Sequence, residues 1–340
     1  MARLESSKWL SNSTGDTLTR RHLLASAFCA QLLSAQKAET IPTDLSLADG
    51  DPLPAELFFV REHFPQPEGL TSAWKLSVAG REFTVDDLTA QPAKTLPVTL
   101  ECAENPSAGG LVSHATWTGV PLATLLPPNP AAAAVRCSSA DSFSHSIPLE
   151  KALHPDTLVA YAMNGEKLPV SHGFPLRLIV PGWYGVASIK WLKSIVLLTS
   201  PDPPTAYLRQ VKSLFGARTT DAVTVTQVKS AFTRPQEGAT LMKRRFTLRG
   251  LAWSGESRIA KVEISLDGAA TWKPATLAPN TAEYAWTPWS FNWLIPRPGE
   301  YSLAVRATDS RGNTQPQYRP ADRVDPYENN GWQTIKVAVV

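Results

Sequence analysis

Residues 169–190 read Pro-Val-Ser-His-Gly-Phe-Pro-Leu-Arg-Leu-Ile-Val-Pro-Gly-Trp-Tyr-Gly-Val-Ala-Ser-Ile-Lys, and this stretch decides how the rest of the chain is interpreted. Its histidine and arginine flank a short apolar strand. Gly182 and Gly185 open a turn in which backbone amides can approach a ligand. Ser188 and Lys190 are expected on one side of the next strand, because they are two residues apart. Together these groups are typical of a site for a phosphate-bearing, strongly polar cofactor.

A second informative stretch, residues 58–65, reads Phe-Phe-Val-Arg-Glu-His-Phe-Pro. Arg61 and His63 are two residues apart on an extended segment, so they point to the same side and can grip one anion together. The alternative is a surface pair beside Glu62, which the stretch by itself slightly favours.

A third stretch holds a cysteine: residues 99–105 read Thr-Leu-Glu-Cys-Ala-Glu-Asn and lead into a Pro/Gly-rich loop. A cysteine where an apolar strand ends is held rigidly, with its sulfur toward a cleft, which suits a metal ligand or a nucleophile. Taken alone, Cys102 is more often a small buried hydrophobic residue.

Composition limits the functions that the 340-residue chain can have. Hydrophobic residues make up 43% and charged residues 19%, so the chain should fold, and its length suits two domains after a leader. A net charge of +3 is too small to indicate nucleic-acid binding. No stretch after the leader is long and apolar enough to span a membrane. All histidines and cysteines after the leader lie before residue 173, so chemistry is expected in the first domain.

The N-terminus, residues 1–38, is predicted to be an export signal. Arg20 and Arg21 precede an apolar run over residues 23–33, which is shorter than the roughly 20 residues of a transmembrane helix. Paired arginines before such a run resemble a twin-arginine signal, and predict a periplasmic protein. The alternative is a chance Arg-Arg pair before a short buried helix.

The rest of the chain is divided into segments by its composition and by its pattern of apolar residues. Residues 39–55 are predicted to be a linker, and residues 56–200 alternate short strands with helix-like pieces such as those at Val85 and Pro121. Residues 201–222 are a Pro-rich crossover. Residues 223–340 contain only period-two runs separated by turn signals, which predicts an immunoglobulin-like sandwich.

The three stretches, in this order and spacing, resemble the molybdopterin-binding domain of the sulfite oxidases over about residues 55–198. Further stretches resemble the family's immunoglobulin-like dimerisation domain: residues 253–255, 262–272, 306–316 and 329–332. The resemblance implies an α+β sulfite-oxidase-type molybdopterin-binding domain followed by an all-β immunoglobulin-like sandwich. It also implies a homodimer and a molybdenum–molybdopterin cofactor.

The resemblance also implies roles for individual residues. Cys102 would be the thiolate ligand to molybdenum, and Arg61 would also face the substrate. Cys137 would then be a core residue rather than a disulfide partner. The residues implied to contact the cofactor are Phe59, Val60, Arg61, Glu62, His63, Cys102, Asp141, His172, Arg177, Ser188, Ile189 and Lys190.

Two departures from the family pattern affect the substrate side. Residues 102–107 read Cys-Ala-Glu-Asn-Pro-Ser, where sulfite oxidases usually continue with Gly-Asn-Arg and a second arginine that cradles sulfite. After the crossover, sulfite oxidases carry a tyrosine in an Arg-Asp-Tyr-Lys setting, hydrogen-bonded near the metal. Residues 207–212 of this chain read Tyr-Leu-Arg-Gln-Val-Lys, so no tyrosine is predicted at that place. Unless Arg209 or Lys212 reaches the pocket, losing one cation weakens anion binding by about 1.5–3 kcal/mol.

The predicted activity is oxygen-atom transfer between water and a small anionic substrate, with sulfite as the leading candidate. Electrons would leave for an external acceptor, a c-type cytochrome in the favoured version, because the chain has no haem or flavin motif. The first alternative keeps the cofactor but acts on another sulfur compound, or reduces an S- or N-oxide. The second is a cofactor-free module that uses the sandwich for adhesion or assembly.

Overall fold

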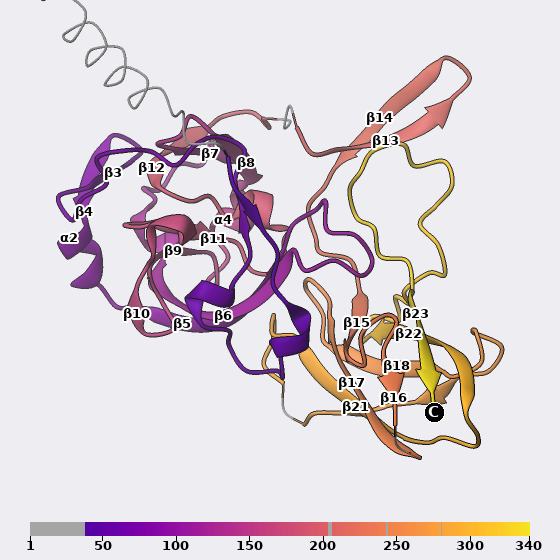
Figure 1. The fold of residues 1–340 in the computed structure, drawn as a ribbon. Coiled ribbons are helices and arrows are strands. Elements are labelled where there is room, and N and C mark those ends of the chain that lie inside the picture. The colour runs from indigo at the N-terminus through magenta and orange to yellow at the C-terminus, as the bar shows by residue number, and fades with distance from the viewer. Residues whose placement is uncertain (1–37, 203–205, 243, 280) are drawn as a thin grey trace, which may run out of the picture. The chain divides into compact units, whose positions relative to one another are not determined.

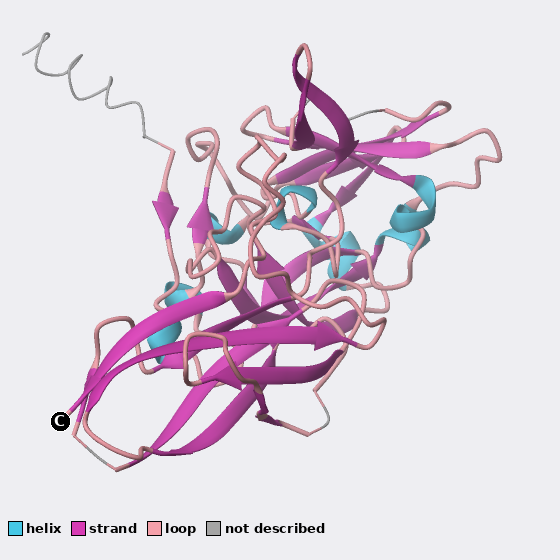
Figure 2. Cartoon of the chain, turned by 90° about the vertical axis from the view of Figure 1, so that its right-hand side faces the viewer, coloured by secondary structure: helices cyan, strands magenta, loops and turns pink. Residues whose placement is uncertain are grey.

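The structure is a computed structural model that describes residues 38–202, 206–242, 244–279 and 281–340 (Figure 1). The predicted export signal lies outside these residues, apart from Ala38. In the described ranges, no helix is long and apolar enough to cross a membrane. Strands dominate, and the helices are short (Figure 2).

The N-terminal part contains two five-stranded sheets. The first is antiparallel and consists of β5 (Lys94–Glu101), β6 (Val112–Pro121), β9 (Leu158–Met163), β10 (Glu166–Lys167) and β11 (Arg177–Ile179). The second has the order β4-β3-β12-β7-β8, and only β12 and β3 are parallel. Its strands are β3 (Lys75–Val78), β4 (Arg81–Thr84), β7 (Ala134–Ser139), β8 (Ser144–Pro148) and β12 (Leu192–Leu198). Short strands β1 (Thr40–Ile41) and β2 (Val60–Arg61) pair with each other.

The helices of this part are single turns at chain reversals. They are α2 (Val85–Thr89), α3 (Leu122–Leu125) and α4 (Leu149–Ala152), with 3-10 turns η1 (Leu45–Leu47), η2 (Ala55–Leu57), η3 (Val170–His172) and η4 (Gly185–Ala187). The helices predicted at Val85 and Pro121 are confirmed, the second beginning one residue later. Thr84 and Asp87 form a capping box that starts α2.

The strand ends of this part hold the functional segments in place. On β5, buried Val98 and Leu100 belong to a core cluster that also contains Cys102. Each fully buried side chain of this kind contributes roughly 1.5–3 kcal/mol, so the strand is a rigid base for the residue that follows it. Strand β5 ends at Glu101, immediately before Cys102.

The C-terminal part consists of two sheets that share one hydrophobic core. One contains β15 (Lys229–Arg234), β17 (Arg245–Trp253), β20 (Thr276–Leu277) and β21 (Thr287–Leu294). The other contains β16 (Thr240–Leu241), β18 (Ile259–Ser265), β19 (Lys273–Pro274), β22 (Gly299–Asp309) and β23 (Gln333–Val339). Leu248 and Trp293 of the first sheet pack in the same cluster as Ile264 and Val305 of the second. The period-two strand predictions are confirmed, whereas the immunoglobulin-like topology stays a prediction.

The segment predicted only as a crossover contains a hairpin of β13 (Leu208–Ser213) and β14 (Gly216–Ala222). Strand β13 is mostly half-buried and β14 is almost wholly exposed, so neither has the alternation of buried apolar and exposed polar residues by which a strand is recognised in a sequence. Leu214 and Phe215 at its tip are 98% and 99% exposed.

Candidate active site

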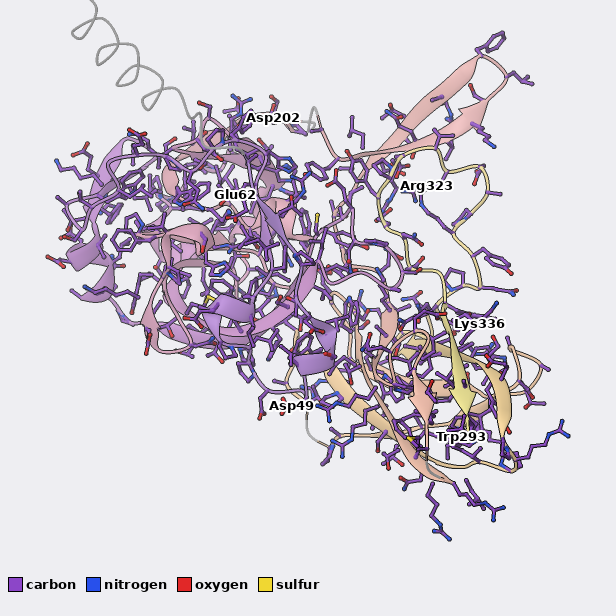
Figure 3. All side chains as sticks on the ribbon, in the orientation of Figure 1. Asp49, Glu62, Asp202, Trp293, Arg323 and Lys336 are labelled. Atoms are coloured by element: carbon purple, nitrogen blue, oxygen red, sulfur yellow. The ribbon has the colours of Figure 1, made fainter. Side chains whose placement is uncertain are left out.

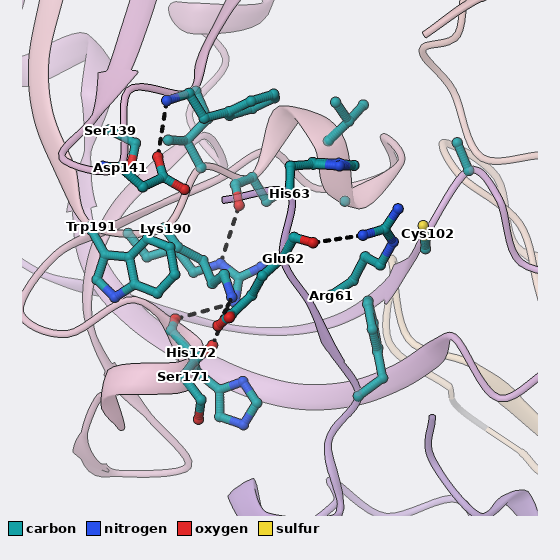
Figure 4. Close-up of a pocket in the computed structure, with 18 of the residues that line it drawn as sticks. Arg61, Glu62, His63, Cys102, Ser139, Asp141, Ser171, His172, Lys190 and Trp191 are labelled. Atoms are coloured by element: carbon teal, nitrogen blue, oxygen red, sulfur yellow. Dashed lines mark hydrogen bonds and ion pairs between the residues drawn. The ribbon is translucent and has the colours of Figure 1, made fainter. Parts of the chain in front are cut away.

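One pocket brings together eleven of the twelve residues that the sequence singled out (Figure 4). The space between its walls is about 730 Å³, part of which is open to solvent. Val60 is the exception: it is buried but does not line the pocket. Side chains alternate along an extended strand, which places Val60 opposite its neighbours Phe59 and Arg61.

Cys102 lines one end of this pocket. Its side chain is a free thiol and the residue is 6% exposed, and burial raises its pKa to about 11. Its backbone is fixed on both sides: its N–H donates to Leu111 O at 2.8 Å, and its carbonyl accepts from Asn105 N at 2.9 Å. A buried thiol becomes a ligand when a metal cation takes the place of its proton.

The donor set fits a metal that brings its other ligands with it. Within the residues that the structure describes, no group of three or more His, Cys, Asp or Glu side chains can hold a metal ion. A metal at Cys102 would therefore need ligands from a cofactor or solvent beside those that the described side chains supply. This agrees with the pterin cofactor that the resemblance implies.

Arg61 lies near Cys102 and is held by a carboxylate. Its Nη2 and Nε donate to Glu104 Oε2 at 2.8 and 3.2 Å, and its Nη1 donates to Glu62 O at 2.6 Å. Burial acts to lower the pKa of Arg61, but the hydrogen bond and charge of Glu104 raise it above its ordinary value. Glu104 thus neutralises much of the positive charge of Arg61 at the Cys102 end of the pocket.

No substitute for the missing arginine lines the pocket. Arg209 is paired with Glu328 through two contacts of 2.6 Å, and Lys212 is exposed on β13. Neither residue is part of the pocket wall. Among the described residues, Arg61 is the only arginine that lines the Cys102 end of the pocket.

The expectation that the site lacks a tyrosine is wrong. Tyr207 lines the pocket, is 6% exposed and is hydrogen-bonded through its hydroxyl to His63 Nε2. Its ring lies 5.0 Å from that of Tyr327, which comes from the C-terminal part. The family motif predicts a tyrosine later in residues 207–212, whereas the tyrosine that enters the pocket is Tyr207, the first residue of that stretch. Burial raises the pKa of Tyr207 well above its ordinary value and lowers that of His63.

The other end of the pocket carries buried cations. Arg177 donates to Ser188 O and His172 O, both at 3.2 Å, and its guanidinium lies 5.0 Å from the ring of Trp117. In the described parts of the chain, no carboxylate forms an ion pair with Arg177, and burial lowers its pKa to about 9. Such a cation is stabilised when an anion enters the pocket, which fits the phosphate of a cofactor.

Lys190 is the second cation at this end. Its Nζ donates to Glu62 Oε1 at 3.0 Å and to Ser171 O at 2.9 Å, and burial lowers its pKa to about 8 (Figure 4). Burial also lowers the pKa of His172 to about 4, so this imidazole is neutral at pH 7. Its Nε2 lies 2.8 Å from Ala55 O. Glu62 and Asp141 offset the charge of Lys190 and part of the charge of Arg177, so Arg177 is the cation at this end that has no carboxylate partner among the described residues.

Ser188 and Lys190 differ from expectation in the element that carries them, whereas Asp141 lines the pocket as predicted. Ser188 and Lys190 reach the pocket from the loop before β12, not from the strand itself. The Ser188 hydroxyl accepts from Val180 N at 3.0 Å. Asp141 lies in the turn between β7 and β8, where its carboxylate accepts from Phe143 N at 2.9 Å.

Gly182 does not serve the pocket, contrary to expectation. Its carbonyl accepts from Thr226 N at 3.0 Å, and a Cβ added to it would lie 2.9 Å from Gly255 O. A Cβ on Gly255 would lie 2.3 Å from Gly182 O. These glycines let the backbones of the two parts approach each other, whereas Gly185 does line the pocket.

Several wall residues were missed from the sequence. Most are direct neighbours of predicted residues and have no reactive group that would mark them. They are Ala103, Ser139, Phe143, Ser171, Val186 and Trp191. Glu62 lies in the N-terminal part that forms the pocket, whereas Trp293 belongs to the C-terminal core (Figure 3).

Two family models match the chain. Residues 63–206 match the oxidoreductase molybdopterin binding domain, and residues 220–340 match the Mo-co oxidoreductase dimerisation domain. Sulfite oxidase of Gallus gallus is 33% identical over 81% of this chain and 70% of its own length. Mitochondrial sulfite oxidase of Homo sapiens is 31% identical over 84% of this chain and 61% of its own length. The chain thus spans less than two thirds of the mammalian relatives.

The chain is also similar to enzymes with other reactions. Nitrate reductase [NADH] 2 of Nicotiana tabacum is 31% identical over 84% of this chain and 38% of its own length. The crystal structure of the sulfane dehydrogenase SoxCD from Paracoccus pantotrophus superposes with a TM-score of 0.80 at 27% identity. That match covers 97% of this chain and 94% of the other.

Proposed function

The chain belongs to the sulfite oxidase family of molybdenum enzymes, and from this premise we propose that it oxidises a reduced sulfur compound with oxygen from water. The cofactor is molybdenum bound to molybdopterin, which supplies two-electron oxygen-atom transfer when bound. Each oxygen added to sulfur consumes one water and releases two protons and two electrons. The electrons leave singly to a separate acceptor, for which a c-type cytochrome remains the proposal.

In this proposal the two ends of the pocket have separate tasks. Cys102 is the protein's ligand to the metal. Arg177 and Lys190 hold the phosphate side, because they are buried cations at the far end of the pocket. Arg61 and Tyr207 face the substrate near Cys102, since both line that end of the pocket. Arg61 is held there by its hydrogen bond to Glu104, and Tyr207 by its hydrogen bond to His63.

The ion pair between Glu104 and Arg61 decides which sulfur compound we favour. A free sulfite dianion needs uncompensated cations, and here the only arginine on the described substrate side is neutralised by a carboxylate 2.8 Å away. A sulfur atom with less negative charge, such as a sulfane sulfur, avoids the repulsion from Glu104. The structural likeness to a sulfane dehydrogenase supports this choice. Sulfite is the second candidate, supported by the sulfite oxidase relatives.

The test is a substrate comparison on enzyme loaded with cofactor in a host that makes molybdopterin. Ferricyanide reduction is measured at equal concentrations with sulfite and with a dialkyl trisulfide, whose central sulfane sulfur belongs to a molecule without net charge. We expect kcat/KM to be at least tenfold higher for a sulfane-containing compound than for sulfite. Higher kcat/KM for sulfite would make the chain a sulfite oxidase. Turnover only in the reductive direction, with an S- or N-oxide or nitrate and a reduced dye, would reject sulfur oxidation.

The assembly and location belong to the same proposal. The match of residues 220–340 to a dimerisation domain supports a homodimer. The twin-arginine pattern at Arg20 and Arg21 supports export to the periplasm with the cofactor already inserted. Light scattering on the loaded enzyme tests the first point, since a mass near 37 kDa for the chain with its leader, or less without it, would reject a dimer.

A further inference from the structure

A buried carboxylate lies directly beside the proposed metal ligand. Glu101 precedes Cys102 and is 2% exposed. Its Oε1 accepts from Lys229 Nζ and Asn105 Nδ2, both at 2.8 Å, and its Oε2 accepts from Trp253 Nε1 at 2.8 Å. Two of these three donors come from the C-terminal part of the chain.

The ammonium group of Lys229 is fully used at this point. It is 2% exposed and donates to Glu101 Oε1 at 2.8 Å, to Asn105 O at 3.1 Å and to Pro106 O at 2.8 Å. An ammonium has three N–H donors, so all of them hold the segment on either side of Cys102. Lys229 of β15 is paired in register with Trp253 of β17, which places both donors side by side on one sheet.

This arrangement fixes both flanks of a five-residue turn. Glu101 is held by the C-terminal sheet, and Asn105 is held by Lys229 and by its own contacts to Glu101 and Leu111 N, the latter at 2.9 Å. Between these two points lie Cys102 and Glu104, the partner of Arg61. The position of both side chains in the pocket therefore depends on residues of the other domain.

Stability alone does not account for such a pair. Moving two charges out of water costs several kcal/mol for each ion, and apolar residues of similar size often stabilise a core equally well. What a saturated ionic cluster provides, and an apolar contact does not, is one defined geometry. Here that geometry is imposed on the turn that carries the proposed ligand.

We infer that Lys229 and Trp253 of the C-terminal domain are positioning residues for the metal site, acting through Glu101 to set where Cys102 and Glu104 point. The inference rests on the proposed role of Cys102 as ligand. It gives the C-terminal domain a role in positioning the active site, in addition to any role in assembly.

The experiment compares loaded enzymes carrying Trp253→Phe, Lys229→Met, and Lys229→Met combined with Glu101→Gln. Molybdenum and pterin contents, the paramagnetic resonance spectrum of the one-electron-reduced metal, and the thermal midpoint are measured for each. Trp253→Phe keeps the packing and removes one donor, so we expect a folded protein with a shifted spectrum and kcat lowered about tenfold. The double variant should shift the spectrum further, while Lys229→Met should lose stability because Glu101 is left unpaired.

The matched control is Lys151→Met, which breaks another ion pair between the two parts. Lys151 Nζ lies 2.7 Å from Glu256 Oε1, and neither residue lines the pocket. This variant should keep the wild-type spectrum even if its thermal midpoint falls. If Trp253→Phe also keeps the wild-type spectrum, the inference is overturned, whether or not the Lys229 variants fold.

Failure of the ligand assignment is recognised separately. Cys102→Ser should lose the spectrum and most of the molybdenum. If it keeps both, the role of Cys102 is wrong and the positioning inference falls with it. If Cys102→Ser behaves as expected and only the substrate comparison fails, positioning by Lys229 and Trp253 still stands.

Discussion

Glu104 Oε2 lies 2.8 Å from Arg61 Nη2 and 3.2 Å from Arg61 Nε, so the arginine that we propose faces the substrate is paired with a carboxylate two residues after Cys102. The side chains are 25% and 29% exposed, so solvent screens the pair only in part. The charge that a sulfite dianion would meet is close to zero at this point. In the function that we propose, this one side chain influences which substrate is favoured.

Replacing Glu104 with glutamine should make the enzyme better with sulfite. The substitution keeps the shape and removes one negative charge beside Arg61, so we expect the KM for sulfite to fall about tenfold, which corresponds to about 1.4 kcal/mol, with a smaller change in kcat. Steady-state ferricyanide assays measure both constants. Glu263→Gln, which breaks the remote pair with Arg306, is the control and should change neither. An unchanged KM in Glu104→Gln would show that this carboxylate does not select the substrate.

The two cysteines should respond differently to substitution. Cys102→Ser is expected to fold and to lose most of its molybdenum, because the serine hydroxyl is a poor soft ligand. Cys137 is completely buried in the core of the N-terminal part, so Cys137→Ala should keep the metal and lower stability by about 1–2 kcal/mol. Elemental analysis and chemical denaturation measure these effects. Equal molybdenum in wild type and Cys102→Ser would refute the ligand assignment.

Arg177 should matter for cofactor retention more than for folding. Arg177 is 6% exposed and donates to the backbone carbonyls of Ser188 and His172, so Arg177→Met removes an uncompensated buried charge from the cofactor-free protein. We expect the cofactor-free variant to melt within a few degrees of wild type and to retain under a tenth of the pterin. Fluorescence of the oxidised pterin measures retention. Arg136→Met, at a surface pair with Asp202, should retain all of it, and full retention by Arg177→Met would reject the phosphate role.

The sequence predicted those parts of the site that are encoded by local spacing. Arg61 and His63 are two residues apart on an extended segment, and Cys102 follows a strand whose apolar residues are recognisable. Strands in the C-terminal part were predictable for the same reason, since their period-two pattern reflects one buried face. Boundaries of the short helices were also close, because Thr84 and Pro121 mark their starts.

What was missed depends on contacts between distant residues. The sequence around Glu101 contains no pattern that predicts its buried ion pair with Lys229, which lies 128 positions later. The sequence predicts that Gly182 lies near a ligand, because a glycine in a turn can allow close approach either to a ligand or to another backbone segment. In the structure, Gly182 approaches the backbone of Gly255. The family motif does not predict Tyr207 as a pocket residue, because the motif marks a different position in the same stretch. Only the three-dimensional path of the chain decides which side chain of that stretch enters the pocket.

Export should depend on the paired arginines. Replacing Arg20 and Arg21 with lysine keeps the charge but removes the planar guanidinium groups, and we expect the periplasmic fraction to fall at least tenfold. Cell fractionation with activity staining measures the change. Arg81→Lys, at the start of β4, is the control. Unchanged export of the Arg20/Arg21 variant would show that the N-terminal segment is not a twin-arginine signal.

Stability should fall with pH between about 6.5 and 4 because three histidines are buried in neutral form. Burial lowers the pKa of His114, His145 and His172 to about 4, whereas an unfolded histidine titrates near 6.5. In this window the unfolded chain binds more protons than the folded one, so folding is fully favoured above pH 6.5 and weakens as the pH falls. Each histidine contributes a slope of at most about 1.4 kcal/mol per pH unit.

His145 is the best site to test this linkage, because it lies on β8 and does not line the pocket. Denaturation of the cofactor-free protein at several pH values should give a slope that is smaller in His145→Gln by up to about 1.4 kcal/mol per pH unit. His154→Gln is the control, since that side chain is 42% exposed and meets solvent in both states. The same slope in His145→Gln and wild type would mean that His145 is protonated equally in the folded and unfolded chain, and the linkage would then have to come from other groups.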